Sequence, residues 1–186
     1  MASDTPSYQL VAGPELLADH NIELRRYETA LVASVRVKSD SWRSAANAAF
    51  QPLANYIFGQ NQRNEKIGMT TPVTTHQIET PTGEIAFEVR FFMPNRYEMD
   101  SLPQPQNGYI QLTKLEEVTF AAIRFNGAAN GAGATQNFAK HETKLRTILG
   151  QAGLTPQSEA HYAVYNGPWT PNLLRRNEVL IAITAP

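Results

Sequence analysis

The sequence contains no cysteine, and this absence removes several classes of chemistry. Disulfide bonds, thiolate metal sites and cysteine nucleophiles are excluded. Thiol usage therefore says nothing about the redox compartment in which the protein works. At 186 residues, the chain is long enough to bury a sizeable core without covalent staples.

An excess of charge and a long apolar run are also absent. Lys and Arg number 16 against 17 Asp and Glu, which removes the broad electrostatic reason to expect nucleic acid or an anionic membrane as a partner. No stretch is long and apolar enough to span a bilayer, and the start of the chain has no apolar signal-peptide core. As written, the sequence predicts a cytoplasmic protein, or an exported one if a leader has been removed.

The first half of the sequence predicts the order strand, helix, strand, strand. Ile22–Val37 is rich in β-branched residues and is expected to form two short strands or one bent strand. Apolar residues then recur at helical spacing from the capping residues Ser39–Ser41 to about Phe58. Pro72 leads into the next strand. Strict alternation from Ile85 to Met93 predicts a further strand with one buried face.

The second half repeats this order. Strands are expected over Tyr109–Leu115 and Val118–Phe125, followed by a glycine-rich loop, a helix and two more strands at Ala160–Asn166 and Glu178–Ala185. We therefore expect one domain over residues 1–186 with internal repeats at about 20–100 and 108–184. Two such halves would best bury their sheet faces and helix stripes in one antiparallel, barrel-like sheet that carries two helices, an α+β arrangement.

Familiar catalytic and metal-binding motifs are missing. The loop NGAANGAGA (Asn126–Ala134) lacks the Walker lysine and the dinucleotide fingerprint, so we interpret it as a flexible, mutable surface loop. No G-x-S-x-G nucleophile motif is present, and no two histidines have metal-ligand spacing. His141 lies on the apolar stripe of the second helix, where it is either a hydrogen-bonded core or cleft histidine or a ligand of a cofactor iron.

The loop GPWTPNLLRR (Gly167–Arg176) carries larger apolar groups than a solvated loop usually does. One interpretation is that it folds back over the end of the barrel and leaves its arginines in solvent. The other is that it forms one wall of a cleft with the first helix and the segment KIGMTT, where Met69 would be an adaptable lining. Apolar walls and a cationic rim would suit a flat amphiphile that carries carboxylates.

Three motifs in this order resemble the SOUL/heme-binding protein family. They are IELRRYETALVASV (Ile22–Val35), NEKIGMTTPVTT (Asn64–Thr75) and YNGPWTPNLLRRNEVLIAI (Tyr165–Ile183). The resemblance covers a core from about residue 8 to residue 183. It implies a pseudo-two-fold, duplicated and distorted antiparallel β-barrel of about eight strands flanked by two α-helices. It also implies binding of heme or other tetrapyrroles in a shallow apolar cleft, rather than catalysis.

The resemblance also implies which residues contact the tetrapyrrole. Met69 matches the methionine of the family's M-T-x-P-V motif, and Gly68 is expected to let the backbone approach closely. Arg63 and Lys66 occupy positions where family members place basic groups that could reach propionates. The expected contact residues are Phe50, Leu53, Ile57, Arg63, Lys66, Ile67, Gly68, Met69, Tyr165, Pro168, Trp169, Leu174, Arg175 and Arg176.

One departure from the family concerns the heme iron. Arg26 stands where some members have a histidine proposed as the axial ligand. Heme b or another porphyrin would then bind without a protein ligand, or through His76, His141 or Met69. Apolar burial and propionate pairing alone leave modest affinity, which predicts a reversible ligand and no obligatory cofactor.

Carrier, buffer or scavenger behaviour follows from a reversible ligand. Two alternatives stay open. Family members are also associated with partner proteins, so the chain could be a protein-interaction module with no physiological tetrapyrrole. It could also be an enzyme that modifies a tetrapyrrole, although the sequence has no evident catalytic acid–base pair.

Overall fold

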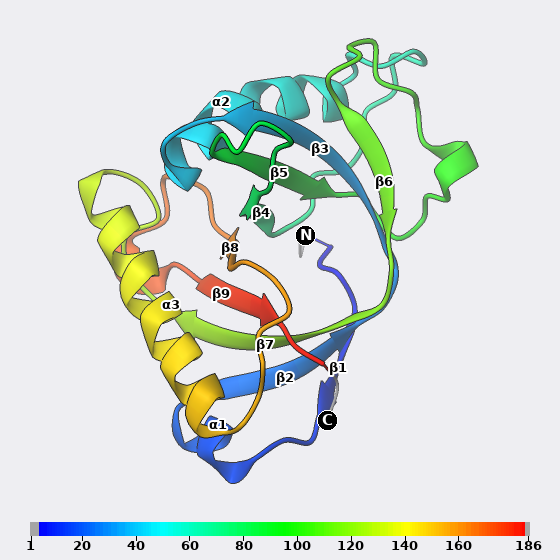
Figure 1. The fold of residues 1–186 in the computed structure, drawn as a ribbon. Helices are drawn as coiled ribbons and strands as arrows, with labels where there is room; N and C mark the ends of the chain where they lie inside the picture. The colour runs from blue at the N-terminus through cyan, green and yellow to red at the C-terminus, as the bar shows by residue number, and fades with distance from the viewer. Residues whose placement is uncertain (1–3, 185–186) are drawn as a thin grey trace. The chain divides into compact units, whose positions relative to one another are not determined.

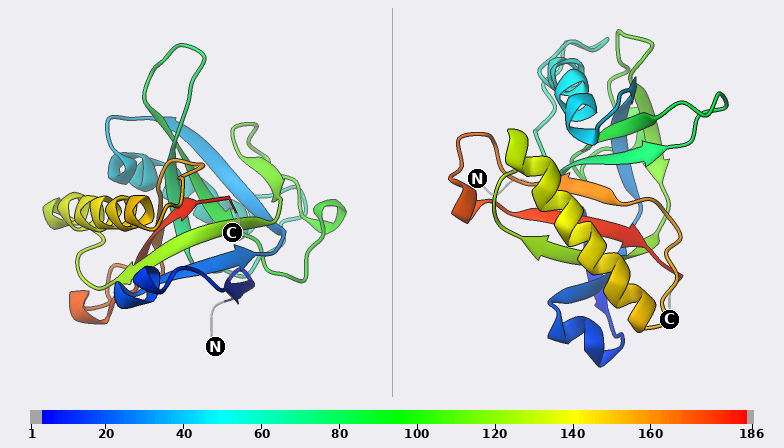
Figure 2. Two further views of the ribbon diagram at one scale, coloured as in Figure 1. Left: turned by 60° about the horizontal axis from the view of Figure 1, so that its bottom comes forward. Right: turned by 60° about the vertical axis from the view of Figure 1, so that its left-hand side comes forward.

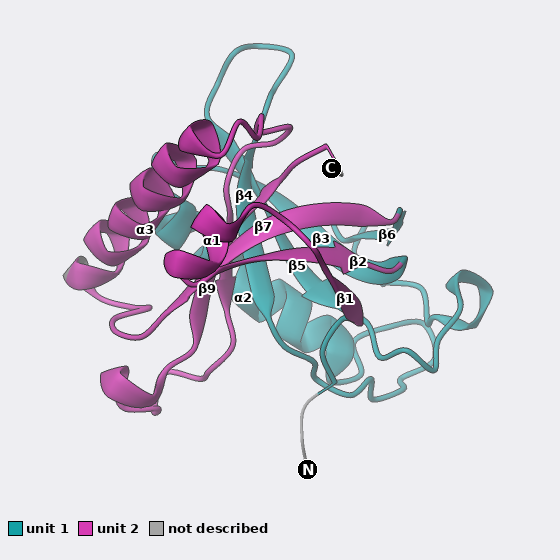
Figure 3. Ribbon diagram, turned by 90° about the horizontal axis from the view of Figure 1, so that it is seen from below, with its two compact units in different colours: residues 1–6, 29–116 teal, residues 7–28, 117–186 magenta. Residues whose placement is uncertain are grey.

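The computed structural model describes residues 4–184, which form two compact units of strands and helices (Figure 1). Unit 1 consists of Thr29–Glu116 together with the described residues up to Pro6 (Figure 3, teal). Unit 2 consists of Ser7–Glu28 together with the described chain from Glu117 onward (Figure 3, magenta). The α+β class expected from the sequence is confirmed.

Unit 1 is an antiparallel sheet with the strand order β4-β5-β3-β6 and one long helix. Helix α2 packs on β3, β4 and β5. Its N-terminus is capped by Ser41, whose side chain accepts a hydrogen bond from the Ser44 amide, as the sequence predicted. The elements are β3 (Ala30–Lys38), α2 (Trp42–Ile57), β4 (Val73–Ile78), β5 (Ala86–Phe92), the short 3-10 helix η1 (Met99–Ser101) and β6 (Gln111–Leu115).

The core of unit 1 lies between α2 and the sheet. Leu53, Tyr56 and Ile57 of α2 are buried. The buried strand face predicted by alternation is confirmed at Phe87, Val89, Phe91 and Met93. Ile85 is an exception and is exposed, because β5 begins only at Ala86 and Ile85 lies in the preceding loop.

Unit 2 is an antiparallel sheet with the order β1-β2-β7-β9-β8. Helix α3 packs on β7 and β9 and runs across the strands of this unit (Figure 2, right). The short helix α1 contacts β2 and α3. The elements are β1 (Tyr8–Val11), α1 (Glu15–Asp19), β2 (Ile22–Tyr27), β7 (Val118–Phe125), α3 (Ala132–Gln151), β8 (His161–Val164), the 3-10 helix η2 (Asn172–Leu174) and β9 (Asn177–Ala182).

Helix α3 is amphipathic, as its apolar spacing predicted. Ala134, Phe138, Leu145 and Ile148 are buried, whereas His141 on the same stripe is only partly covered. Within residues 4–184, no helix has the length and apolar character needed to cross a membrane.

The predicted order strand, helix, strand, strand is found in both units, as β3-α2-β4-β5 and β7-α3-β8-β9. The segment Ile22–Val37 forms two strands, but they belong to different units, because β2 pairs with β7 and β3 pairs with β5. The compact units are defined by contacts and not by sequence repetition, so the repeats expected at about 20–100 and 108–184 stay a prediction. Residues 4–184 contain nine strands rather than about eight, and the short helix α1 is additional.

Candidate functional site

In unit 1, the segment Lys66–Pro72 fastens the end of α2 to the sheet. The Ile67 amide donates a hydrogen bond of 2.8 Å to the Ile57 carbonyl, and the Ile67 side chain is buried. The Thr70 hydroxyl donates to the Phe92 carbonyl at the end of β5. Part of the motif KIGMTT therefore has a structural role that needs no ligand.

Two large apolar side chains among the expected contacts remain half-exposed in unit 1. Phe50 and Met69 each have 44% of their surface in solvent. The Phe50 ring is held edge-on against Phe91, with 5.5 Å between ring centroids. Leu53 and Ile57, by contrast, lie in the core of unit 1, where they support α2 rather than present a surface.

Gly68 is not required by the packing of unit 1. A Cβ atom added there would meet Pro94 at 3.7 Å and Arg96 at 3.9 Å, which are ordinary van der Waals distances. Its φ angle also lies outside the left-handed region that favours glycine. No close approach within unit 1 explains this glycine, so the expected approach of a ligand stays a prediction.

The expected basic residues of unit 1 differ in their surroundings. Arg63 donates a hydrogen bond of 3.1 Å from Nη1 to the Ser101 carbonyl, and this nitrogen lies 3.9 Å from a Glu65 carboxylate oxygen. Lys66 is exposed. Both side chains can meet an anionic group from solvent, and Arg63 would have to exchange its present partners to do so.

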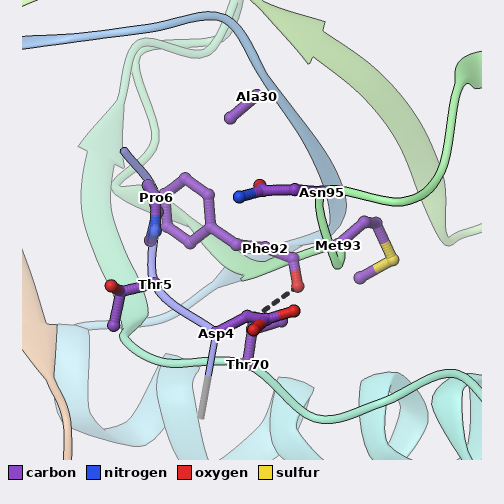
Figure 4. Close-up of a pocket in the computed structure, with 8 residues that line it drawn as sticks. All are labelled: Asp4, Thr5, Pro6, Ala30, Thr70, Phe92, Met93 and Asn95. Atoms are coloured by element: carbon purple, nitrogen blue, oxygen red, sulfur yellow. Dashed lines mark hydrogen bonds between the residues drawn. The ribbon is translucent and has the colours of Figure 1, made fainter. Parts of the chain in front are cut away.

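A pocket in unit 1 lies beside the same segment (Figure 4). The Thr71 amide donates a hydrogen bond of 3.0 Å to the Asp4 carbonyl at its edge. The space open to a water-sized sphere is about 10 Å³, enough for about one water molecule. This pocket does not accommodate a planar tetrapyrrole. Its lining residues are Asp4, Thr5, Pro6, Ala30, Thr70, Phe92, Met93 and Asn95.

In unit 2, the loop Gly167–Arg176 presents three large apolar side chains to solvent, and we call it the apolar loop. The exposed fractions are 93% for Trp169, 84% for Leu173 and 72% for Leu174. Large apolar groups exposed to this extent on neighbouring positions commonly mark a binding surface.

Arg175 braces the apolar loop from inside. Its side chain is buried and its guanidinium donates three hydrogen bonds, to the Thr170 carbonyl (2.7 Å), the Asn130 side-chain oxygen (2.9 Å) and the Pro168 carbonyl. The sequence led us to expect this arginine in solvent or at a cationic rim. Burial was not anticipated because the partners of Arg175 come from loop carbonyls and from a residue far away in the sequence.

The glycine-rich loop Asn126–Ala134 is the support of the apolar loop. The Asn126 side chain donates to the Leu173 carbonyl, and the Gly127 amide donates to the Asn172 carbonyl at 2.9 Å. Gly127 has a φ of 115°, and an added Cβ atom would lie 2.8 Å from the Asn137 side chain. The interpretation as a mutable surface loop is therefore wrong at this position. The two Asn-Gly pairs are the sequence signal of its tight turns.

A buried carboxylate lies at the other end of the apolar loop. Glu178 accepts hydrogen bonds from Arg25 (2.8 and 3.2 Å), from the Tyr165 hydroxyl (2.7 Å) and from Nε of Arg176 (3.0 Å). Burial would raise the pKa of Glu178, but these donors, Arg25 foremost, lower it. Burial, and then the charge of Glu178, raises the pKa of Tyr165.

Tyr165 and Arg176 also contact each other, because the guanidinium of Arg176 lies 3.9 Å from the centre of the Tyr165 ring. Two of the expected ligand contacts are therefore joined to the carboxylate and to one another. Arg176 keeps part of its side chain in solvent, as does Pro168.

His76 in unit 1 is buried among charged groups. Its Nε2 lies 3.8 Å from a carboxylate oxygen of Glu88, which also binds Arg36 and Arg90. Burial, followed by the positive charge of Arg90, lowers the pKa of His76 to about 4. The ring is neutral at physiological pH and is enclosed in this cluster.

His141 in unit 2 has a fixed orientation on helix α3. Its Nδ1 lies 2.7 Å from the Asn137 carbonyl oxygen, and its ring is stacked on Phe125 with 3.8 Å between centroids and 5° between planes. Burial lowers the pKa of His141. Across residues 4–184, no group of three or more His, Asp and Glu residues is placed so that it could hold a metal ion.

Comparisons with known proteins agree with the three motifs. A family model described as SOUL heme-binding protein matches residues 3–182. Heme-binding protein 1 of Xenopus tropicalis is 32% identical over 161 residues, which cover 84% of this chain and 80% of that protein. Heme-binding protein 2 of Homo sapiens is 30% identical over 184 residues, covering 96% and 85%.

A solved structure agrees at the level of the fold. The C-terminal domain of EcmrR superimposes with a TM-score of 0.65 at 11% identity and covers 96% of this chain and 99% of its own. At this identity, the similarity shows that the two chains share a fold and supports no conclusion about function.

Proposed function

Because the chain belongs to the SOUL heme-binding protein family, we propose that it binds heme or a related tetrapyrrole reversibly, as a carrier, buffer or scavenger. The names of the two relatives support a tetrapyrrole as the ligand class. The observation that carries the proposal for this chain is the apolar loop, in which Trp169, Leu173 and Leu174 stand in solvent.

The apolar loop is held in shape before any ligand arrives. Arg175 binds two of its carbonyls and Asn130, while Asn126 binds the Leu173 carbonyl. A braced loop loses little conformational entropy on binding, so more of the apolar contact appears as affinity. Fully burying a side chain of this kind contributes about 1.5–3 kcal/mol, which suits a flat apolar ligand.

The packing of the core within each unit favours a reversible ligand over a permanent cofactor. Leu53 and Tyr56 in unit 1, and Phe138 and Leu145 in unit 2, are fully buried by protein alone. Close packing of each core by protein side chains supports a ligand that binds reversibly. In unit 1, the contacts that the resemblance implies stay predictions: Phe50, Gly68 and Met69 as apolar contacts, and Lys66 and Arg63 as partners of propionate groups.

The test is a titration of the protein with hemin and, separately, with metal-free protoporphyrin IX. Trp169 and Trp42 are the two tryptophans of the chain, and only Trp169 is exposed. We expect saturable one-to-one binding that quenches the emission of Trp169. Trp169→Ala should remove that quenching and weaken binding roughly tenfold, equivalent to about 1.4 kcal/mol. Trp42, which is buried, is the one tryptophan that remains in Trp169→Ala.

Three results would contradict the proposal. Porphyrin binding that does not saturate, or that is the same in Trp169→Ala, would remove the apolar loop from the site. A stable complex with a partner protein that forms without porphyrin and is lost in Trp169→Ala would favour an interaction module. Conversion of many equivalents of metalloporphyrin would favour an enzyme.

A further inference from the structure

We infer that Nε2 of His141 is the atom through which this chain ligates heme iron. The inference rests on the proposed function and concerns the chemistry of the same ligand. Of the three candidate iron ligands, His76, His141 and Met69, it selects the one on helix α3. It also predicts that heme binds more tightly than metal-free porphyrins, because only heme would gain a bond from the protein.

The hydrogen bond of His141 determines which nitrogen is available. A backbone carbonyl oxygen can only accept, so the nitrogen 2.7 Å from the Asn137 carbonyl, Nδ1, must carry the proton. Nε2 then holds the lone pair in the neutral ring. A metal-bound histidine typically donates its other ring N–H to a carbonyl or carboxylate, which fixes the tautomer. His141 already has that arrangement.

The ring of His141 is also fixed in direction. It lies nearly parallel to the Phe125 ring, with 5° between the planes. Phe125 in turn packs edge-on against the buried Phe138, with 5.0 Å between centroids. The imidazole therefore cannot rotate freely without losing both the stacking and the hydrogen bond, and a pre-oriented ligand costs little entropy when it binds a metal.

The protonation state favours ligation as well. Burial lowers the pKa of His141, and the nearby positive charges of Lys140 and Lys144 lower it further, while the bond to Asn137 acts in the opposite direction. The ring is thus neutral at physiological pH, which is the form that binds metals. Lys140 and Lys144 are exposed on the same helix and are suited to meet propionate groups.

His141 is connected to the apolar loop within unit 2. Phe125, on which the ring stacks, is followed directly by Asn126, and the Asn126 side chain donates to the Leu173 carbonyl. A second link runs through Asn137, whose side chain donates to the carbonyls of Asn126 (3.3 Å) and Ala128 (3.2 Å) and whose own carbonyl accepts from His141. The loop and the imidazole thus share one hydrogen-bonded support.

The two other candidates fit iron less well. His76 is buried, and its Nε2 faces the carboxylate of Glu88, which Arg36 and Arg90 also bind. Ligation there would require opening this charged cluster. Met69 is half-exposed and offers a thioether, which suits an apolar lining.

The experiment compares the wild type with His141→Phe, which keeps a ring on Phe125 but removes the nitrogen ligand. We expect the ferric heme complex of the wild type to show the absorption and electron paramagnetic resonance signature of an imidazole ligand. His141→Phe should lose this signature and bind hemin at least tenfold more weakly, with protoporphyrin IX affinity unchanged within about twofold. His20→Phe is the matched control and should behave as the wild type.

Two results would overturn the inference, and they are distinguishable. If His141→Phe retains the spectrum and hemin affinity of the wild type, heme is bound without His141 and the proposed function stands. If the wild type binds neither porphyrin, the proposed function itself fails. Should His141→Phe not fold, the ring ¹⁵N resonances of wild-type His141 provide the readout, since a ligating Nε2 must show a large paramagnetic shift on addition of hemin and an unchanged resonance overturns the inference.

Discussion

Arg25 of β2 and Glu178 of β9 form a buried ion pair that spans the intervening strand β7, with Nη1–Oε2 and Nη2–Oε1 distances of 2.8 and 3.2 Å. The side chains are 3% and 0% exposed. Each charge is tolerated in the interior because the other is present. Although burial opposes a charged guanidinium, Glu178 raises the pKa of Arg25 above its ordinary value. The pair ties β2 to β9 within unit 2, and Glu178 also binds Arg176 at the end of the apolar loop.

Replacing Arg25 with methionine should destabilise the protein by about 3–5 kcal/mol, because Glu178 then loses its two-point partner while it stays buried. Urea unfolding measures this loss. Arg26→Met on the same strand is the control, since Arg26 faces Glu117 at 3.8 Å and the two side chains are 43% and 62% exposed. The control should cost less than about 1 kcal/mol. Equal losses of unfolding free energy in the two variants would show that the buried ion pair stabilises the protein no more than the exposed one.

The stability of the protein should fall between about pH 6.5 and pH 4 because of His76. Burial, and next the charge of Arg90, lowers the pKa of His76 to about 4 from 6.5, with Arg36 acting in the same direction and Glu88 against it. In this interval the unfolded chain binds a proton that the folded protein does not. The free energy of unfolding therefore decreases as the pH falls, by up to about 1.4 kcal/mol per pH unit.

Urea unfolding of the wild type and of His76→Gln from pH 7.5 to 4.5 measures this effect. The variant should show a flatter pH dependence in that range, whatever its stability at pH 7.5. A ring titration of His76 by NMR gives the folded pKa directly. A midpoint near 6.5, or parallel pH profiles of the two proteins, would refute the assignment.

Gly68→Ala should leave stability nearly unchanged and weaken porphyrin binding. The added methyl group has room in unit 1, and φ is not in the left-handed region, so a change within about 0.5 kcal/mol is expected. Gly59→Ala is the opposite case, because Gly59 has a φ of 115°. This variant should lose about 1 kcal/mol or more of stability. If Gly68→Ala binds porphyrin as the wild type does, the backbone there does not approach the ligand.

Arg175→Ala should loosen the apolar loop. Its guanidinium binds Thr170, Pro168 and Asn130, and no shorter side chain can replace these three bonds. Hydrogen exchange of the amides in 167–174 should become faster, with the protection of β7 and β9 retained. Arg176→Ala is the neighbouring control, since its guanidinium contacts Tyr165 and Glu178 instead. Unchanged exchange in Arg175→Ala would show that the loop is held by other means.

The distinction between Arg175 and Arg176 also affects how binding data are interpreted. A loss of porphyrin affinity in Arg175→Ala that accompanies faster exchange in the loop reports on the shape of the loop. It is not evidence for a bond between Arg175 and a propionate group. A propionate bond should instead be sought at Arg63, Lys66, Lys140 or Lys144, which are exposed.

Local patterns were sufficient to predict most elements of the fold. The strand Val118–Phe125 has the predicted bounds, and α2 begins at Trp42 directly after the predicted cap. These features depend on neighbouring residues only, because side-chain alternation and helical spacing follow from backbone geometry. The strand Tyr8–Val11 and the helix Glu15–Asp19 were missed, since four and five residues are too few to show a period.

Tertiary structure decided which polar residues are buried and with what partners. Two adjacent arginines look alike in the sequence, yet Arg175 bonds to Asn130 from 45 positions away and is buried, while Arg176 remains partly in solvent. Glu178 meets Arg25 across 153 positions. His141 could be assigned to an apolar stripe from its spacing, but its free nitrogen was identified only by the bond to Asn137 and the ring of Phe125. Such pairings depend on where distant segments meet, and local periodicity carries no information about that.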